Sequence, residues 1–338
     1  MSKMEKNTLE AMPDVAIERI LKDCNYADIQ SLRKSCSRLR GLVDLLKPNP
    51  KVKQINCRLS PRFMLMHLVL SDGQSAEVYY KAVDGGCTVA TGKQEWDFTG
   101  RRFFANTTIA SMILQDFKIV KDSLVHQPTP LEKCRIRIHG RDLSVFQDSI
   151  GVSCAELPQL RITSLRIDLD DCRHFPSILP LVSSDELRRL RIVARREPQH
   201  IVNINEITQL DHWRSIRILK FRDFPINDLS IIASVPNSEI QLHIISPEQA
   251  IWLKETFRNS QTFEHCSVRF EYDCRVLMTR AIIFGDEAVD DPYDDWETIW
   301  FFTSPRPGKV FKVYYFMSLL QFSLADVAEV DEEDRVYD

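Results

Sequence analysis

The apolar positions along this 338-residue chain follow two different periods. Between residues 12 and 42 they recur in steps of three and four, which is the period of amphipathic helices. Residues typical of helix starts and ends divide this stretch into three parts: Pro13, Asp14, Asn25, Asp28, Ser35 and Pro48. Three helices of this size are marginal as an independent domain. We therefore expect a partner or the rest of the chain to cover their surplus apolar surface.

Past these helices the period changes to two. Apolar residues alternate over residues 64–70, 76–80 and 88–90, with turn signals at Asp72-Gly73 and at 84–86, which predicts a three-stranded antiparallel meander. An amphipathic helix follows, whose apolar face comprises Ile109, Met112, Ile113, Phe117, Val120 and Leu124.

An irregular repeat occupies the middle of the chain, with the unit apolar-x-x-apolar-x-apolar. Its copies are Leu131/Cys134/Ile136, Ile162/Leu165/Ile167, Leu187/Leu190/Ile192, Ile216/Leu219/Phe221 and Phe263/Cys266/Val268, with a degenerate copy at Asn237/Ile240/Leu242. Segments between copies suit short helices, most clearly residues 247–258, where Ser246 and Gln249 fit a capping box. A strand with a short helix buries its apolar face only by stacking on further copies, so we expect an irregular α/β solenoid.

The last part of the chain has a different pattern. Residues 298–303 and 310–316 flank a loop rich in Pro and Gly, which predicts a hairpin that caps the solenoid. Residues 286–297 are acidic, as is the segment from 326 onward, which is predicted to be disordered. The expected fold class is therefore α+β or α/β, in four segments: 1–48, 49–127, 128–275 and 276–338.

Composition narrows the class of protein. Hydrophobic residues make up 44% and charged residues 27% of the chain, which is typical of soluble globular proteins. The net charge of −4 argues against a bulk nucleic-acid binder. Nine cysteines without a Cys-x-x-Cys pair favour a reducing compartment, and neither a signal sequence nor a membrane span is visible. We expect a location in the cytoplasm or nucleus.

A column of cations follows the repeats. The residue between the second and third apolar positions points to the opposite face of its strand, because side chains alternate. This column reads Arg135, Arg166, Arg191, Lys220, Gln241 and Ser267, and the next reads Arg137, Asp168, Val193, Arg222, His243 and Arg269. The candidates for binding an acidic or phosphorylated partner segment are Arg135, Arg166, Arg191, Lys220 and Arg222. The alternative is that these charges only solvate an exposed strand face.

Catalytic and metal-binding patterns are weak. Cys172 and His174 have ligand spacing, but no second pair accompanies them. Residues 86–93 (GCTVATGK) miss the phosphate-loop pattern by one residue, and Gln94 replaces the Ser or Thr that would hold magnesium. No nucleophile signature of a hydrolase is present. We expect a non-enzymatic protein without cofactor or metal.

The helical stretch resembles an F-box, the motif that docks a substrate receptor onto the Skp adaptor of cullin-based ubiquitin ligases. The resemblance is carried without a gap by Met12-Pro13, Ile20-Leu21, Asp28-Ile29, Leu32-Arg33, Cys36 and Leu39. Two positions depart from the family pattern: Met12 replaces the usual Leu, and Ala16 is small. The resemblance implies an adaptor-binding surface that includes Met12, Pro13, Ile17, Ile20, Leu21, Leu32, Cys36 and Leu39. An ordinary helical subdomain packed on the rest of the chain is the alternative.

The repeat region is similar to leucine-rich repeats, although it lacks a regular Asn or Cys after each strand. Over residues 8–275 the chain resembles the large nematode family of F-box proteins with an FTH-type region. The resemblance implies a substrate-recognition subunit of a Skp-cullin-F-box (SCF) ubiquitin ligase that binds a protein substrate. The rivals are a protein that binds the adaptor without delivering a substrate, and an enzyme using the repeat face, for which no assembled catalytic set is visible.

Overall fold

The structure is a computed structural model with an α+β fold, three N-terminal helices followed by a large mixed sheet. It describes residues 9, 12–91, 102–125, 127–140, 159–171, 175–195, 210–223, 229–242, 245–270, 297–316, 318–330 and 336–337. The chain divides into two compact units, residues 1–165 with 177–186, and residues 166–176 with 187–338. The predicted acidic stretch 286–296 and His243 lie outside the described residues.

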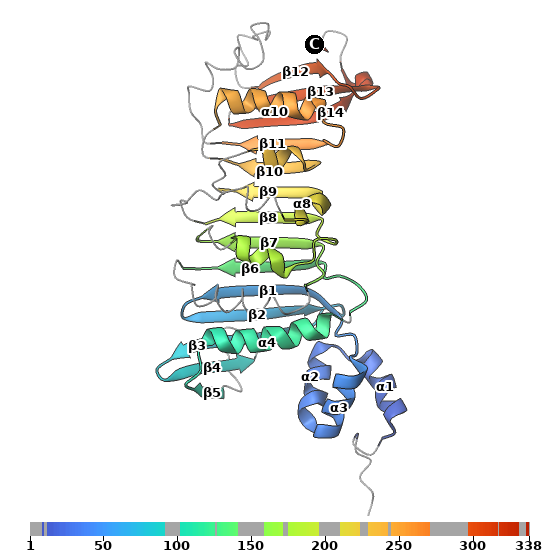
Figure 1. The fold of residues 1–338 in the computed structure, drawn as a ribbon, viewed down its shortest axis with the longest axis vertical. Coiled ribbons are helices and arrows are strands. Elements are labelled where there is room, and N and C mark those ends of the chain that lie inside the picture. The colour runs from blue at the N-terminus through green and yellow to red at the C-terminus, as the bar shows by residue number, and fades with distance from the viewer. Residues whose placement is uncertain are drawn as a thin grey trace, which may run out of the picture. The chain divides into compact units, whose positions relative to one another are not determined.

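The first unit begins with helices α1 (Asp14–Asp23), α2 (Tyr26–Ser35) and α3 (Ser37–Leu46) (Figure 1). The helix start predicted at Asn25 and Asp28 is confirmed, and the structure shows that these two residues form a capping box. The Asp28 N–H donates to the Asn25 side chain at 3.1 Å, and the Asn25 N–H donates to the Asp28 carboxylate at 3.2 Å.

The predicted cap of the third helix is wrong by one residue. Cys36 caps α3, its Sγ accepting from the Leu39 N–H at 3.4 Å. Ser35 ends α2 instead, where its hydroxyl donates to the Leu32 carbonyl at 2.7 Å. A hydroxyl engaged in closing one helix is not available to cap the next.

The sheet of the first unit contains β1 (Val52–Ser60), β2 (Phe63–Leu70), β3 (Ser75–Val83), β4 (Gly86–Thr91), β5 (Arg102–Ala105) and β6 (Lys133–Ile138), in the order β6-β1-β2-β3-β4-β5. All neighbours are antiparallel except β1 and β6, which are parallel. The predicted meander is confirmed as β2–β4, and β1 and β5 extend it. Strand β1 was missed because its polar residues obscure the alternation of the buried Ile55, Cys57 and Leu59.

The predicted amphipathic helix is confirmed as α4 (Ile109–Leu124), which packs on β2 and β3 (Figure 1). Gln127, just after it, is buried and fixes the start of β1: its side chain accepts from the Val52 N–H at 3.1 Å and donates to the Val52 carbonyl at 2.9 Å. This amide thus replaces a strand partner for Val52.

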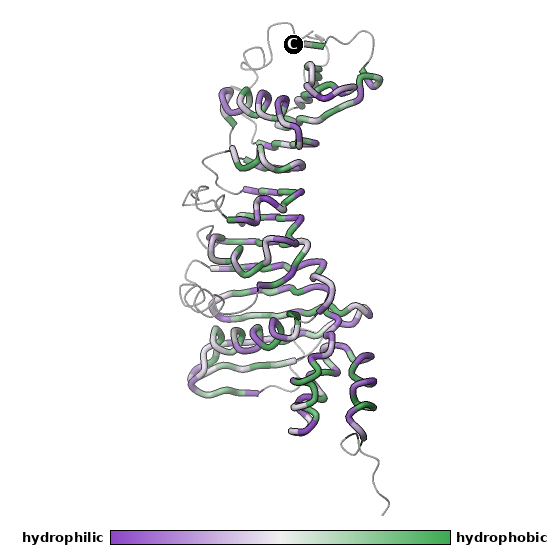
Figure 2. The backbone as a smooth tube through the Cα atoms, turned by 45° about the vertical axis from the view of Figure 1, so that its right-hand side comes forward, coloured by the Kyte–Doolittle hydropathy of each residue, from purple (hydrophilic) through white to green (hydrophobic). Residues whose placement is uncertain are grey.

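The second unit is built on parallel strands β8 (Arg189–Ala194), β9 (Ile218–Arg222), β10 (Asn237–Gln241) and β11 (His265–Arg269). Beyond β11 follow β14 (Leu319–Asp326), β13 (Lys309–Phe316) and β12 (Glu297–Thr303), all antiparallel, and then β15 (Val336–Tyr337), parallel to β12. The boundary between the two units falls within β7 (Ser164–Leu169). Hydrophobic and hydrophilic residues alternate along many strands (Figure 2).

Short helices lie between the later strands in sequence: α6 (Phe175–Ile178), η3 (Leu179–Leu181), α8 (His212–Ser215), α9 (Ser230–Ala233) and α10 (Pro247–Asn259). The prediction for α10 is confirmed in detail. Ser246 and Gln249 form the capping box, and Pro247 occupies the first helical turn.

The repeat pattern locates the buried positions of strands β8, β9 and β11, but it misassigns β10. Leu190, Leu219 and Cys266 are each at most 1% exposed, as the repeat predicts. In the degenerate copy, however, Ser238 lies beside Leu219 and Cys266, so the predicted Asn237/Ile240/Leu242 assignment is wrong by two residues. A small polar residue at a core position hid the pattern, which continues as Val235, Ser238 and Ile240.

The C-terminal part of the second unit contains more strands than the predicted hairpin. The predicted hairpin is confirmed as β12 and β13, but β14 was missed and it pairs with both β13 and β11. The prediction of disorder from residue 326 onward is wrong for its described part. Asp326 still belongs to β14, η4 (Val327–Glu329) follows, and β15 pairs with β12.

Candidate functional site

The three N-terminal helices have a small core of their own. Its buried members are Ile17, Leu21, Ile29, Leu39 and Val43, with Cys24, Leu32, Cys36, Leu42 and Leu46 packed against them. Three of the eight predicted adaptor-binding residues, Ile17, Leu21 and Leu39, therefore lie inside this core, and Leu32 and Cys36 are half-buried beside it. The three buried side chains cannot contact an adaptor directly. They can only support the helices whose outer surface would do so.

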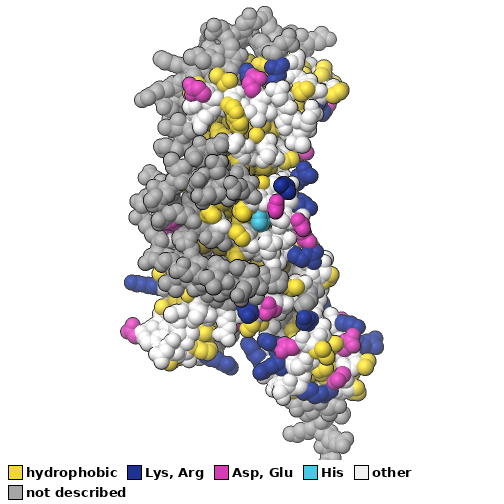
Figure 3. Space-filling view, in the orientation of Figure 1, with side chains coloured by type: hydrophobic (Ala, Val, Ile, Leu, Met, Phe, Trp, Pro, Cys, Tyr) yellow, Lys and Arg dark blue, Asp and Glu magenta, His cyan; other side chains and the backbone are white. Residues whose placement is uncertain are grey.

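The other three predicted residues are exposed. Met12 is 37% and Ile20 36% exposed, and Pro13 is exposed as well. Two exposed apolar residues were not predicted, Val15 at 79% and Leu45 at 75%. Figure 3 shows apolar side chains between charged ones on the surface of these helices. Helical spacing from the core residues would have placed Val15 and Leu45 on outward faces.

The chain before α1 is held against the start of α3. The Arg38 guanidinium donates to the Met12 carbonyl at 2.8 Å and also to the Asp14 carboxylate. The ion pair is exposed and contributes little to stability. Its consequence is geometric, because it fixes Met12 and Pro13 beside the helices.

Polar contacts join these helices to the sheet of the same unit. The buried Asn25 side chain donates to Asp72 at 3.2 Å and to Gln74 at 3.4 Å. The Lys51 ammonium donates to the Asp23 carbonyl at 2.9 Å. Burial raises the pKa of the Tyr26 hydroxyl, and the charge of Asp116 raises it further, so this phenol stays neutral.

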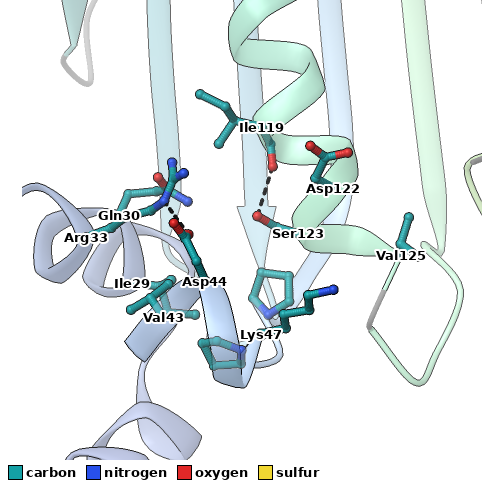
Figure 4. A pocket seen from close by; sticks show the side chains of 12 residues that line it. Ile29, Gln30, Arg33, Val43, Asp44, Lys47, Ile119, Asp122, Ser123 and Val125 are labelled. Carbon is teal, nitrogen blue, oxygen red and sulfur yellow. Dashed lines mark hydrogen bonds and ion pairs between the residues drawn. The ribbon is translucent and has the colours of Figure 1, made fainter. Parts of the chain in front are cut away.

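A cleft of about 350 Å³ lies between α2, α3 and α4 (Figure 4). Ile29 and Val43 are among the apolar residues that line it, and the Arg33 guanidinium, which also lines it, donates to the Asp44 carboxylate at 2.8 Å. Lys47 and Asp122 also line it. The charges are of both signs and partly paired, so no single ligand chemistry is indicated.

The predicted cations are partly neutralised by neighbouring carboxylates. In the second unit, Arg191, Lys220 and Glu239 lie opposite one another on β8, β9 and β10. Lys220 pairs with Glu239, and its hydrogen bond lowers the pKa of that carboxyl. The prediction had placed Gln241 in this column, whereas Gln241 lies beside Arg222.

The remaining predicted cations have different surroundings. Arg166 donates to the fully buried Asp168 at 2.8 Å, so it supports the fold. Arg222 is exposed and pairs with Asp223 at 3.4 Å. Arg135 belongs to the first unit, where it lies opposite Asn56 and is half-buried.

Two of the buried thiols, those of Cys57 and Cys266, are enclosed in the sheet core. Burial raises the pKa of Cys57 and of Cys266 to about 12, so both stay protonated near neutral pH. In the part of the chain that the structure describes, no three His, Cys, Asp or Glu side chains cluster as metal ligands would. None of the described helices is long and apolar enough to cross a membrane.

Comparison with protein families identifies two domains. The F-box domain model matches residues 9–51, and the FTH domain model matches residues 148–281. The chain is an F-box protein with an FTH domain. This confirms the resemblance drawn from Met12-Pro13 onward, whereas the nematode origin stays a prediction. No curated protein and no solved structure matches the chain.

F-box domains bind Skp-type adaptors, and no catalytic family is indicated for this F-box protein. The F-box match covers the three helices and their whole core. The FTH match covers β7 to β11, and with them Arg166, Arg191, Lys220 and Arg222, whereas Arg135 lies outside it.

Proposed function

We propose that this F-box protein is the substrate-recognition subunit of an SCF-type ubiquitin ligase, linked through a Skp adaptor to a cullin. The observation that carries the proposal is the division of apolar residues in the F-box. Ile17, Leu21 and Leu39 stabilise the helices, whereas Met12 and Ile20 stay exposed and contribute nothing to that core. Contiguous exposed apolar patches mark protein interfaces, and we propose that Met12 and Ile20 belong to one.

The ligase reaction requires no chemistry on this chain. A receptor that holds a substrate near the ubiquitin-carrying enzyme raises the effective concentration of substrate lysines there. Cytoplasm or nucleus is the proposed location.

The substrate surface we propose is the strand face of the FTH domain opposite the short helices. We interpret its parallel strands as a short, irregular solenoid similar to leucine-rich repeats, which typically bind partners on a strand-lined face. Arg191, Lys220 and Arg222 lie on neighbouring strands there. Exposed guanidinium groups favour acidic or phosphorylated segments, which they bind with charge-assisted hydrogen bonds.

Adaptor capture tests the docking half. Met12→Asp plus Ile20→Asp places two carboxylates on the exposed apolar surface without touching the core, so binding to a purified Skp-type adaptor should fall at least tenfold. Lys34→Asp, at an exposed position of α2, is the matched control for added negative charge. Adaptor binding that survives the double substitution would rule out this surface.

Partner capture tests the substrate half. Arg191→Glu plus Arg222→Glu reverses two cations of the strand face and avoids Arg166, whose buried ion pair supports the fold. Arg214→Glu, 87% exposed on α8, is the control. We expect loss of ubiquitylated partners but retention of the adaptor. If the variant retains its partners unchanged, the proposed substrate surface is wrong. If the native chain binds the adaptor but no ubiquitylated partner is found, the protein that binds the adaptor without delivering a substrate is favoured.

A further inference from the structure

One row of side chains crosses the strand face of the second unit and changes from charged to apolar. Residues that lie directly opposite one another on neighbouring strands share a face of the sheet. The register of β9, β10, β11, β14 and β13 forms a row that we call the Gln241 row: Arg222, Gln241, Arg269, Leu319 and Phe316. The row therefore joins the parallel strands of the FTH domain to the antiparallel strands beyond it.

The Gln241 row lies on the face of the sheet that the core does not use. The adjacent residues Phe221, Val268 and Leu320 point to the opposite face and are at most 3% exposed. Helix α10 packs on that opposite face, where the ring centre of Phe257 lies 5.5 Å from that of Phe322 (Figure 1). Within the row, the two arginines are exposed and the other three residues are half-buried. Folding thus leaves the charged end of the row accessible.

The charged end of the row fits a phosphate group. Arg222 and Arg269 lie on either side of Gln241, and the row contains no acidic residue. Neighbouring strands are about 4.8 Å apart, so the Cα atoms of the two arginines are about 10 Å apart and both side chains can reach one group above Gln241. A phosphorylated side chain carries nearly two negative charges and three acceptor oxygens, which two guanidinium groups can share. A carboxylate balances only one of them.

Two carboxylates near this end are already paired. Glu239 pairs with Lys220, and Asp223 pairs with Arg222 at 3.4 Å. Each side chain of the two pairs is at least 43% exposed, so the pairs contribute little and a stronger ligand can replace them. Arg191, directly opposite Lys220, adds a further cation. The surroundings of the row therefore favour an anion with more than one charge.

The other end of the face is apolar. Its residues on β12, β13 and β14, from the Gln241 row and the row beside it, are Ile299, Tyr314, Phe316 and Leu319. Ile299 is 41% exposed. Leu319 lies two strands and Phe316 three strands from Gln241, which corresponds to about 10 and 14 Å. An extended chain advances about 3.3 Å per residue, so it covers these distances in about three or four residues.

We infer that this face binds an extended segment of a substrate protein in which a phosphorylated residue lies about three or four positions from a large apolar residue. The segment lies across the strands. Its phosphate accepts hydrogen bonds from Arg222 and Arg269 above Gln241, and its apolar side chain packs on Leu319 and Phe316. This inference rests on the proposed substrate surface, to which it adds Arg269, the apolar end and the spacing between the two contacts.

The spacing is tested with fluorescent peptides, whose anisotropy is measured with the full native chain. Each peptide holds one phosphoserine and one leucine in a scaffold of Gly and Ser, with separations of one to eight positions and in both orders. We expect separations of three and four to bind at least tenfold more tightly than separations of one and eight, in one of the two orders. The same peptides with Ser or Glu in place of phosphoserine should bind at least tenfold more weakly, since neither supplies a doubly charged group.

Variants of the chain test the two contacts separately. Arg269→Gln should weaken binding of the best peptide at least tenfold. Its matched control is Arg189→Gln, which removes an exposed cation from the same face on β8. For the apolar contact, Leu319→Gln in the chain and Asn in place of leucine in the peptide should each weaken binding, and the two changes together should weaken it no more than either alone. The spacing series uses only the native chain, so it remains a test even if a variant does not fold.

Several results would overturn the inference. These are no binding of any peptide, an affinity that does not depend on the separation, and equal binding of the phosphoserine and Glu peptides. Displacement of the best peptide by a short oligouridine of equal affinity would also overturn it, since the face would then bind nucleic acid. Adaptor capture, and the loss of ubiquitylated partners in Arg191→Glu plus Arg222→Glu, are measured separately. If those two results hold and the affinity does not depend on spacing, this inference alone is wrong and the ligase proposal stands.

Discussion

The F-box and the parallel strands of the FTH domain use apolar residues differently. In the F-box, apolar side chains face both the shared core, as at Ile17, and the solvent, as at Ile20. In the strands, the apolar positions are buried, and the outward charges pair with each other, as Lys220 does with Glu239. Folding explains both sets of strand residues, but it does not explain exposed apolar side chains in the F-box. Functional inference is therefore stronger for the F-box than for the cation column.

The largest effect should come from the aromatic core at the C-terminal end of the second unit. Phe322 is fully buried, 5.5 Å from Phe257 and 6.0 Å from Phe311 between ring centres. Phe322→Ala should lower the free energy of unfolding by about 3–5 kcal/mol, because it removes contacts and leaves a cavity. Denaturant unfolding followed by fluorescence measures this loss. Phe103→Ala, at a 57% exposed position, should change it by less than about 0.5 kcal/mol.

The next effect compares inward and outward residues of one helix. Ile17→Ala should cost about 2–5 kcal/mol, because Ile17 is fully buried in the core of the F-box. Ile20→Ala, one turn further along α1, should cost less than about 1 kcal/mol. Thermal unfolding measures the loss of stability in each of the two variants. Equal losses would mean that Ile20 belongs to the core, and the comparison between the two regions would fail.

Local sequence rules predicted the features that short-range chemistry determines. The capping box at Ser246 depends on residues three apart and was predicted correctly, as was the helix start at Asn25 and Asp28. Strand β14 was not predicted, although it pairs with its neighbour β13, because the two residues between them are Met and Ser and not a hairpin signal such as Asn-Gly or Asp-Gly. Its other partner, β11, lies some fifty residues away in sequence, and no local signal marks that pairing. Ser238 misled the repeat assignment, because a polar residue at a buried position contradicts the apolar pattern.

The candidate site residues were also predicted only as far as local sequence rules reach. Their position along the chain identified Ile20 and Lys220 as candidates, but burial separated Ile20 from Ile17, and pairing joined Lys220 to Glu239. Neither property can be derived without the neighbouring elements. Asp168 is the clearest example. The alternation of side chains along the strand predicted that Asp168 faces the solvent, whereas the structure buries it completely.

A smaller effect should follow from removing that buried carboxylate charge. Asp168 accepts from Arg166 at 2.8 Å and lies 3.8 Å from Arg195, and both guanidinium groups are partly exposed. Asp168→Asn should therefore cost about 1–3 kcal/mol, less than the loss of a fully buried pair, because water can solvate the arginines. Denaturant unfolding measures the loss, with Asp211→Asn, 71% exposed, as the control. An unchanged free energy of unfolding would leave Arg166 available as a substrate contact.

The smallest effect concerns the pH dependence of the strand face. The Lys220 hydrogen bond lowers the pKa of Glu239 from its usual 4.5, despite an opposing contribution from burial. The unfolded chain therefore binds a proton more readily at this carboxyl than the folded chain does. The stability gained from the pair is present above pH 4.5 and disappears as the pH falls through the lower folded pKa. Because the carboxylate is 48% exposed, the contribution should stay below about 1 kcal/mol.

The measurement is the free energy of unfolding between about pH 5 and pH 3, which should fall less in Glu239→Gln than in the native chain. The control is Glu329→Gln, at an exposed position of η4, which should behave like the native chain. A native pH profile in Glu239→Gln would mean that Lys220 is not held by this carboxylate, and Lys220 would then be as available to a partner as the sequence predicted.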